Sequence, residues 1–235
     1  TNICLAISAM KVFLAQHLAD QFNSVYQQCN QLFDDVASAI AIENRTLKNA
    51  CLYYLSALPA GNSLIEQQFS TANNMTDSLA AIKYAATNDL GCFKALSDQF
   101  EQTWSTNTLV MDKWFSIQAM WNNDEVINHV NALLTHPLFS FENPNRARSL
   151  IGSFANGNPK YFHDMSGQGY EFLTNQVIKL DNINPQVASR MVTGLIQFQA
   201  LDENRQSLIK RQLERINSKQ SLSNDLEEKL TAALS

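Results

Sequence analysis

Two arginines, Arg146 and Arg148, stand at the start of the segment 143–163, next to apolar residues that a helix would bury. Leu150 and Phe154 follow within eight positions. Residues two positions apart on an α-helix point about 200° apart, so the two guanidinium groups cannot share a direction. If one of them lies outward, the other must lie near the buried or concave side of its helix.

Arg190 presents a similar case, because it lies between Val187 and Val192 in a segment with a broad apolar face. An inward arginine can pair with a carboxylate or with the carbonyl groups at a helix C-terminus. Alternatively, it can line a cavity and bind an anion such as a carboxylate, which a planar guanidinium holds through two parallel hydrogen bonds. The residue pattern alone leaves both interpretations open.

No other motif indicates a self-contained active site. The four histidines are His17, His129, His136 and His163. None begins an HExxH zinc motif, no cysteine lies at metal-ligand spacing from a histidine, and GxxxxGK[ST] and GxSxG are absent. His163 and Asp164 are adjacent, but adjacent side chains do not face each other, so we expect a surface histidine there. We therefore predict no catalytic residue and no metal ligand in this chain.

Composition and charge bound the class of protein. The 235 residues are 45% hydrophobic, which is enough for a substantial core. The 17 basic and 22 acidic residues give a net charge of −5, which argues against a general nucleic-acid binder. No stretch approaches the roughly 20 apolar residues of a membrane span. The apolar segment 3–15 carries Lys11 and lacks a basic leader, so it is a poor signal peptide. We expect neither nucleic acid nor a membrane as a partner.

The cysteines indicate a reducing compartment. Four of them are widely spaced without a CxxC pair: Cys4, Cys29, Cys51 and Cys92. A core of this size does not need a disulfide scaffold, so we expect free and mostly buried thiols and a cytoplasmic location. The chain begins with Thr1 instead of Met, and we interpret it as part of something longer.

The elements that must position these side chains are helices. Only seven glycines and five prolines occur, which disfavours an all-β domain. Two apolar stripes follow helical spacing: Val110, Trp114, Ile117 and Trp121, and Val187, Met191, Leu195 and Phe198. We expect the three tryptophans, which include Trp104, to pack in the core, with a ligand platform as the alternative.

Asn-Pro pairs at 143–144, 158–159 and 184–185 predict three helix starts, with Asn as the cap and Pro in the first turn. Asp202 and Ser223 are further cap candidates. We predict about a dozen helices of about 10–18 residues, with no strand. Short helices with short links become antiparallel pairs that stack into a curved, ARM/HEAT-like α-solenoid. We predict one such all-α domain over residues 1–235.

Six segments, in order, resemble one known domain. They are RTLKNACLYYLSAL from residue 45, NNMTDSLAA (73–81), LVMDKWFSIQA (109–119), NPNRARSLIGSFANGNP (143–159), GYEFL (169–173) and NPQVASR (184–190). Together they are similar to the C-terminal helical domain of bacterial aminopeptidase N, in the M1 family of zinc aminopeptidases. The similarity runs from about residue 40 to the end of the chain.

The resemblance implies a four-domain enzyme whose zinc site, with HExxH, lies in a thermolysin-like domain. The last domain is a superhelical array that closes over the active site. This chain has neither HExxH nor GxMEN, so it resembles most of that last domain alone. The family places two cavity-facing arginines near the peptide substrate, and they match Arg148 and Arg190. On this view Arg148 points inward and Arg146 outward, while Ala147 stands where the family has Ile.

The function that the resemblance implies is removal of N-terminal residues from peptides by a zinc-dependent aminopeptidase. This chain would close the active-site cavity and control the access of peptides, with Arg148 and Arg190 binding substrate. Its partners would be peptides and the catalytic domain of the same polypeptide, which holds the zinc, so the isolated chain is expected to be inactive. The alternative, from a different class, is a non-enzymatic α-solenoid scaffold whose concave face binds a protein.

Overall fold

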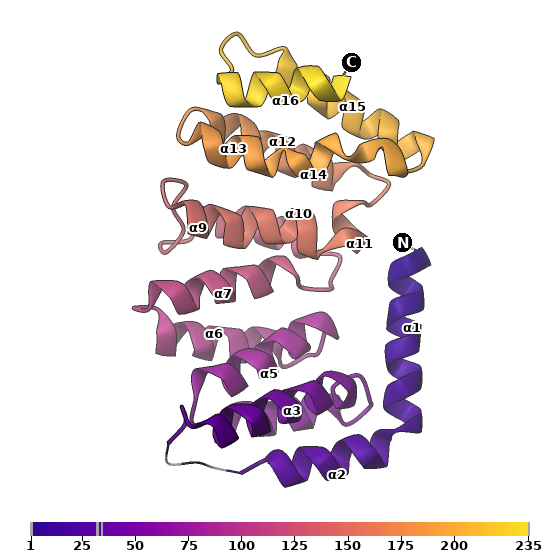
Figure 1. Cartoon of the computed structure of the whole chain (residues 1–235), viewed down its shortest axis with the longest axis vertical. Coiled ribbons are helices and arrows are strands. Elements are labelled where there is room, and N and C mark those ends of the chain that lie inside the picture. The colour runs from indigo at the N-terminus through magenta and orange to yellow at the C-terminus, as the bar shows by residue number, and fades with distance from the viewer. Residues whose placement is uncertain (1, 32, 34, 235) are drawn as a thin grey trace. The chain divides into compact units, whose positions relative to one another are not determined.

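The computed structural model describes residues 2–31, 33 and 35–234, and all the regular elements in this part are helical (Figure 1). The prediction of an all-α chain is therefore confirmed. The chain divides into two compact units, residues 2–117 and the residues from 118 onward. The single domain expected over residues 1–235 stays a prediction.

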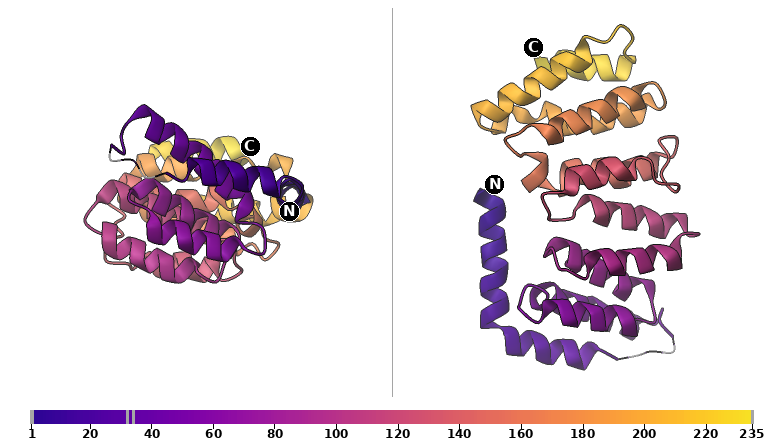
Figure 2. Two further views of the ribbon diagram at one scale, coloured as in Figure 1. Left: turned by 90° about the horizontal axis from the view of Figure 1, so that it is seen from below. Right: turned by 180° about the vertical axis from the view of Figure 1, so that it is seen from behind.

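The first unit contains helices of 11 to 17 residues. They are α1 (Asn2–His17), α2 (Ala19–Cys29), α3 (Ala39–Leu55), α4 (Gly61–Thr71), α5 (Met75–Thr87), α6 (Phe93–Trp104) and α7 (Thr108–Ala119), the last of which ends just past the boundary. Successive helices pack on each other, α2 on α3, α4 on α5 and α5 on α6. Figure 2 shows that α1 instead runs beside this stack, outside its layers.

The first predicted stripe is buried as expected. Val110, Trp114 and Ile117 lie on the buried face of α7, while Trp121 is buried just after the helix ends. The Trp114 Nε1 donates a 2.9 Å hydrogen bond to Ser97 Oγ, which supplies the polar partner that a buried indole needs. Core packing is confirmed for Trp114 and Trp121, whereas Trp104 is half-buried.

The second unit has shorter elements. They are α8 (Val126–Leu133), α9 (Pro144–Ala147), a π-helical turn η1 (Arg148–Gly152), α10 (Ser153–Gly157), α11 (Pro159–Phe162), α12 (Gln168–Asp181), α13 (Pro185–Met191), α14 (Thr193–Ile196), a 3-10 turn η2 (Phe198–Ala200), α15 (Glu203–Asn217) and α16 (Asn224–Leu234). Helix α12 packs against α13 and α15, and α13 packs against α16. Several of these pieces are shorter than the predicted 10–18 residues.

Most of the predicted helix starts are confirmed. The side chain of Asn143 accepts hydrogen bonds from the amides of Asn145 and Arg146, and Asn184 accepts one from Val187. Asp202 likewise accepts one from Arg205 at the start of α15. Ser223 immediately precedes α16, but its amide and hydroxyl both donate to Asp181.

Asn158 is the exception among the three Asn-Pro pairs. It precedes α11, but its side chain caps no amide there. The Asn158 Nδ2 instead donates 3.1 Å hydrogen bonds to the carbonyl oxygens of Ala119 and Trp121. The predicted cap is wrong, because this buried amide satisfies carbonyl groups at the end of α7 that have no partner within the helix.

The second predicted stripe is buried but not continuous. Val187, Met191, Leu195 and Phe198 are all at most 7% exposed. The helix nevertheless ends at Met191 and resumes as α14 and η2. Val192, Thr193 and Gly194 all have low helix propensity, which weakens the helix at this point.

No single helix in the described part is long and apolar enough to cross a bilayer. Helices α1 and α2 pass that test only when taken together, by length and composition, and they are bent by 78° relative to each other.

Candidate functional site

Arg146 lies opposite to its expected placement. It is only 4% exposed, and its Nη1 donates a 2.9 Å hydrogen bond to the carbonyl oxygen of Leu138. The guanidinium therefore ties the start of this helical segment to the preceding loop. The outward direction predicted for Arg146 is wrong, because a loop carbonyl supplies an internal partner that the helical pattern does not reveal.

Arg148 is the exposed member of the pair. Its Nη1 donates a 3.2 Å hydrogen bond to Asn145 Oδ1, and no carboxylate of the described residues lies within salt-bridge distance. The wide angle predicted between the two arginines thus fits the structure, with one buried and one in solvent. Arg148 also begins η1, and π-helical turns of this kind are frequent at functional sites.

Arg190 is exposed in the last turn of α13, where a cation interacts favourably with the helix dipole. It forms no hydrogen bond or ion pair with any described residue. The backbone beneath it is fixed, because Ser189 Oγ donates to the carbonyl of Asp225 at 3.1 Å and Lys229 Nζ donates to the carbonyl of Ser189 at 2.6 Å. An exposed guanidinium therefore projects from an anchored helix end.

Arg148 and Arg190 lie on elements that contact each other, since η1 packs against α13. Both guanidinium groups are permanently charged, open to solvent and without a carboxylate partner among the described residues. Such groups can bind a carboxylate through paired charge-assisted hydrogen bonds. The arrangement suits binding and orientation of an anionic group; neither arginine can serve as a nucleophile or a general base.

The adjacent pair His163 and Asp164 does not form an acid–base unit. His163 Nδ1 lies 2.9 Å from the hydroxyl of Tyr170, while Asp164 Oδ1 accepts a 2.9 Å hydrogen bond from the amide of Ser166. Burial, followed by the positive charge of Arg205, lowers the pKa of His163. The expectation of a surface histidine is only partly correct, because the side chain is half-buried against Tyr170.

The metal-ligating side chains and the cysteine thiols do not form a reactive site among the described residues. In the described ranges, 2–31, 33 and 35–234, no group of three or more His, Cys, Asp or Glu side chains is placed to hold a metal ion. All four cysteines are free; Cys29, Cys51 and Cys92 are buried and Cys4 is half-buried. Burial is the main cause that raises the pKa of both Cys51 and Cys92, which disfavours the reactive thiolate.

Sequence reasoning missed two buried lysines. Lys48 Nζ pairs with Asp77 Oδ2 at 2.6 Å within a buried polar network. Lys11 is only 8% exposed; its Nζ donates a 2.8 Å hydrogen bond to Asn88 Oδ1 and lies 4.1 Å from the ring centroid of Tyr53. Lys11 is the one Asp, Glu, Lys or Arg between residues 2 and 17, and that isolation is the signal that could have revealed it.

Comparisons with known proteins show which family the chain resembles. A protein-family model described as "Domain of unknown function (DUF3458_C) ARM repeats" matches residues 1–235. The chain is 45% identical to aminopeptidase N of Haemophilus influenzae over 99% of its own length and 27% of that protein. It is 42% identical to aminopeptidase N of Escherichia coli over 94% of its own length and 26% of that protein. The chain thus spans about a quarter of the length of the curated relatives it matches.

A solved structure shows the same fold. It is the crystal structure of Legionella pneumophila aminopeptidase A in complex with aspartic acid, with a TM-score of 0.85 and 26% identity. The match covers 96% of this chain and 28% of that chain. The ARM-repeat match and this likeness confirm the α-solenoid class, and the relatives confirm the resemblance to the helical domain of bacterial aminopeptidase N.

Proposed function

The chain belongs to the DUF3458_C family of ARM-repeat domains, and on this premise we propose that it is the helical domain of a zinc-dependent M1 aminopeptidase. The observation that carries the proposal is the similarity of nearly the whole chain to bacterial aminopeptidase N. The activity would belong to a longer polypeptide, since this chain corresponds to about a quarter of those relatives. It would remove N-terminal residues from peptides.

In that enzyme the chain would close the active-site cavity and limit access to peptides. Zinc, held by the catalytic domain, would polarise the N-terminal peptide carbonyl and activate water. The residues of this chain would act on the other end of the substrate. Arg148 and Arg190 would bind the C-terminal carboxylate of short peptides, where Coulomb attraction gains strength in a partly desolvated cavity.

Three properties of the arginines support this role. Both side chains are exposed, neither has a carboxylate partner among the described residues, and their elements are in contact. An exposed arginine without a carboxylate partner contributes little to stability, so its guanidinium is available for a ligand. For localisation we propose the cytoplasm, which the four free cysteines support.

The experiment compares the complete gene product with the isolated chain of residues 1–235. We expect the complete gene to encode HExxH outside this chain, and its product to cleave an aminoacyl-anilide in a reaction that a chelator abolishes. The isolated chain should have no such activity. A complete gene product without HExxH and without chelator-sensitive cleavage would overturn the proposal in favour of the non-enzymatic α-solenoid scaffold.

A further inference from the structure

Helix α1 exposes apolar side chains on most of its circumference. Ile3, Leu5 and Ile7 are 75%, 65% and 60% exposed, and Met10 and Phe13 are 59% and 52% exposed. Leu5 points about 200° away from Ile3, so the exposed apolar surface is not confined to one edge. A helix that is apolar all round is normally buried within a larger protein. The face of α1 that turns away from its own unit therefore lacks a cover.

The helix also forms one wall of an apolar groove within the first unit. The groove has a volume of about 460 Å³, and its lining includes Ile3, Ile7, Met10, Leu14, Tyr53 and Tyr54. The four aliphatic residues follow i, i+4, i+7, i+11 spacing, which forms a continuous stripe along α1. The two tyrosines come from α3. The groove is thus suited to receive apolar side chains laid along the helix.

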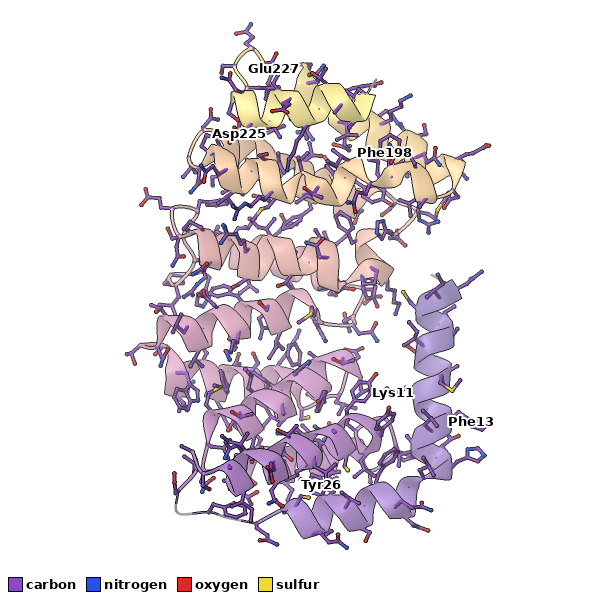
Figure 3. All side chains as sticks on the ribbon, in the orientation of Figure 1. Lys11, Phe13, Tyr26, Phe198, Asp225 and Glu227 are labelled. Carbon is purple, nitrogen blue, oxygen red and sulfur yellow. The ribbon has the colours of Figure 1, made fainter. Side chains whose placement is uncertain are left out.

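One cation lines this groove. Figure 3 shows Lys11 on the side of α1 that faces the neighbouring helices of its unit, whereas Phe13 points away from them. The Lys11 Nζ has three N–H groups, of which one reaches Asn88 Oδ1, and its other partner is the face of the Tyr53 ring. No carboxylate of the described residues lies within salt-bridge distance of Lys11.

The lysine is held in this position. Asn88 cannot turn its amide around, because its Nδ2 donates to Ser56 Oγ at 2.8 Å and to the carbonyl of Tyr84 at 2.9 Å. Its Oδ1 is therefore committed to Lys11. A nearly buried ammonium with only an amide and a ring as partners is stabilised further by any anion that reaches it. The groove accordingly combines an apolar stripe with a fixed, uncompensated positive charge.

A membrane surface, a second copy of the chain and another segment of a longer polypeptide would each present different groups to the exposed surface of α1. A membrane-surface helix carries Lys and Arg on its polar face, but the single Lys of α1 faces the protein. A second copy docked symmetrically through α1 would present another Lys11 and no acidic residue, since α1 contains neither Asp nor Glu. A different segment of a longer polypeptide can supply both apolar side chains and a carboxylate.

We propose that α1 and its groove dock another segment of the same longer polypeptide, with apolar side chains on Ile3, Ile7 and Met10 and an Asp or Glu carboxylate on Lys11 Nζ. The relatives that this chain matches are about four times its length. A longer polypeptide of that size would contain many residues outside 1–235 that could supply such a segment. This inference rests on the proposed function only because both require the longer polypeptide. It assigns no role in catalysis to α1.

The first test measures cysteine accessibility in the complete gene product. Ile7→Cys is compared with Leu109→Cys, because Leu109 is similarly exposed at 68% but lies outside the groove and α1. We expect maleimide to modify Ile7→Cys about tenfold more slowly than Leu109→Cys in the folded protein, and at an equal rate in denaturant. Site-resolved mass spectrometry separates these thiols from the native cysteines, and circular dichroism confirms that both variants fold.

Two outcomes of that test would overturn the inference. Equal rates for the two variants in the folded protein would show that the α1 surface is open to solvent. Protection of Ile7→Cys that disappears on dilution would show that a second copy covers it. Neither outcome depends on cleavage of an anilide, so failure of this inference is distinguishable from failure of the proposed function.

The second test identifies the anionic partner. A carbodiimide joins an amine directly to a carboxylate in contact with it, and mass spectrometry locates the linked peptides. We expect Lys11 to be linked to an Asp or Glu outside residues 1–235. Lys83, an exposed lysine of the same unit whose Nζ lies 5.8 Å from the Tyr84 ring centroid, serves as the control and should give no such link. Absence of a Lys11 link, or links only within residues 1–235, would contradict the proposed carboxylate contact.

Discussion

Arg146 and Arg148 bring the same guanidinium group into opposite environments within one turn of helix. Arg146 is buried against the carbonyl of Leu138, and Arg148 is exposed beside Asn145. The first therefore stabilises the junction between a loop and a helix. The second keeps most of its hydrogen-bonding capacity for a ligand.

This contrast gives a stability prediction for two matched substitutions in the chain of residues 1–235. Arg146→Ala removes a buried donor from a loop carbonyl and should lower the free energy of unfolding by about 1–3 kcal/mol. Arg148→Ala should change it by less than about 0.5 kcal/mol, as for most exposed positions. Urea unfolding followed by circular dichroism measures both. Equal losses of unfolding free energy in the two variants would contradict a structural role for Arg146 and a free, ligand-binding role for Arg148.

Lys11 shows what burial without a carboxylate does to a charge. Burial lowers the pKa of this lysine from 10.5 to about 8. Tyr53 and Tyr84 lie in the same region, and burial raises the pKa of each, so neither offers a negative charge at neutral pH. Between about pH 8 and 10.5 the unfolded chain binds the proton that the folded chain has released.

The sign of the resulting pH effect follows from this proton balance. Because the unfolded state binds more protons in that window, stability should rise with pH between about 8 and 10.5. The gain should be on the order of 1 kcal/mol, because the nearly buried ammonium lines a groove that solvent can enter, which reduces the cost of its charge. Urea midpoints of the 1–235 chain at both ends of the window measure it. The rise in stability with pH should vanish in Lys11→Met and persist in Lys83→Met. A rise that remains in Lys11→Met would show that Lys11 does not cause it.

At the scale of elements, a buried polar network joins four helices of the first unit. Asp77 of α5 pairs with Lys48 and accepts a 2.8 Å hydrogen bond from Asn49 Nδ2, both on α3. Gln68 of α4 donates to Asn49 Oδ1 at 2.8 Å and accepts from the hydroxyl of Tyr26 on α2 at 2.9 Å. Since every member finds a partner, the network fixes how these helices register against one another.

Breaking this network at Asp77, its one carboxylate among the residues that the structure describes, should be costly. Asp77→Ala leaves the Lys48 ammonium buried without its counter-charge, and we expect the free energy of unfolding to fall by about 3–5 kcal/mol. Asp98→Ala on α6 is the matched control, because Asp98 is exposed and should change stability by less than about 0.5 kcal/mol. Chemical unfolding of the 1–235 chain gives both values. A similar small effect for the two variants would show that the network does not stabilise the unit.

Local patterns predicted the helical elements well, and they failed where a distant backbone group intervened. The caps Asn143, Asn184 and Asp202 were predictable because a cap and its amides are neighbours in sequence. Asn158 was not, because its partners at Ala119 and Trp121 lie almost 40 positions away. No sequence-local signal encodes that contact.

The candidate site was less accessible to sequence reasoning than the fold. The residue pattern required Arg146 and Arg148 to point apart, but it could not decide which one was buried, because the Leu138 carbonyl comes from a loop. The choice of Arg148 and Arg190 came from the resemblance to a family. Their exposure and lack of carboxylate partners became visible only with the structure, and their binding role stays a prediction.

At the scale of the whole molecule, the proposed enzyme separates chemistry from substrate selection. A catalytic domain would hold the zinc, and the helical domain would supply two cations for the far end of a short peptide. The apolar surface of α1 would secure contact with another segment of the polypeptide. Loss of the arginines should therefore weaken binding of substrates that carry a free carboxylate, while the rate of the bound substrate stays nearly unchanged.

The most direct measurement is steady-state cleavage of a tripeptide and of its C-terminal amide by the complete enzyme. In the double variant Arg148→Ala/Arg190→Ala, KM for the free acid should rise about tenfold with kcat within about twofold, since charge-assisted hydrogen bonds of about 1.5–3 kcal/mol are partly offset by solvent. KM for the amide should not change, and neither substrate should respond to Arg211→Ala, an exposed arginine on α15. An unchanged KM for the free acid, or an equal rise for acid and amide, would contradict carboxylate binding by this domain.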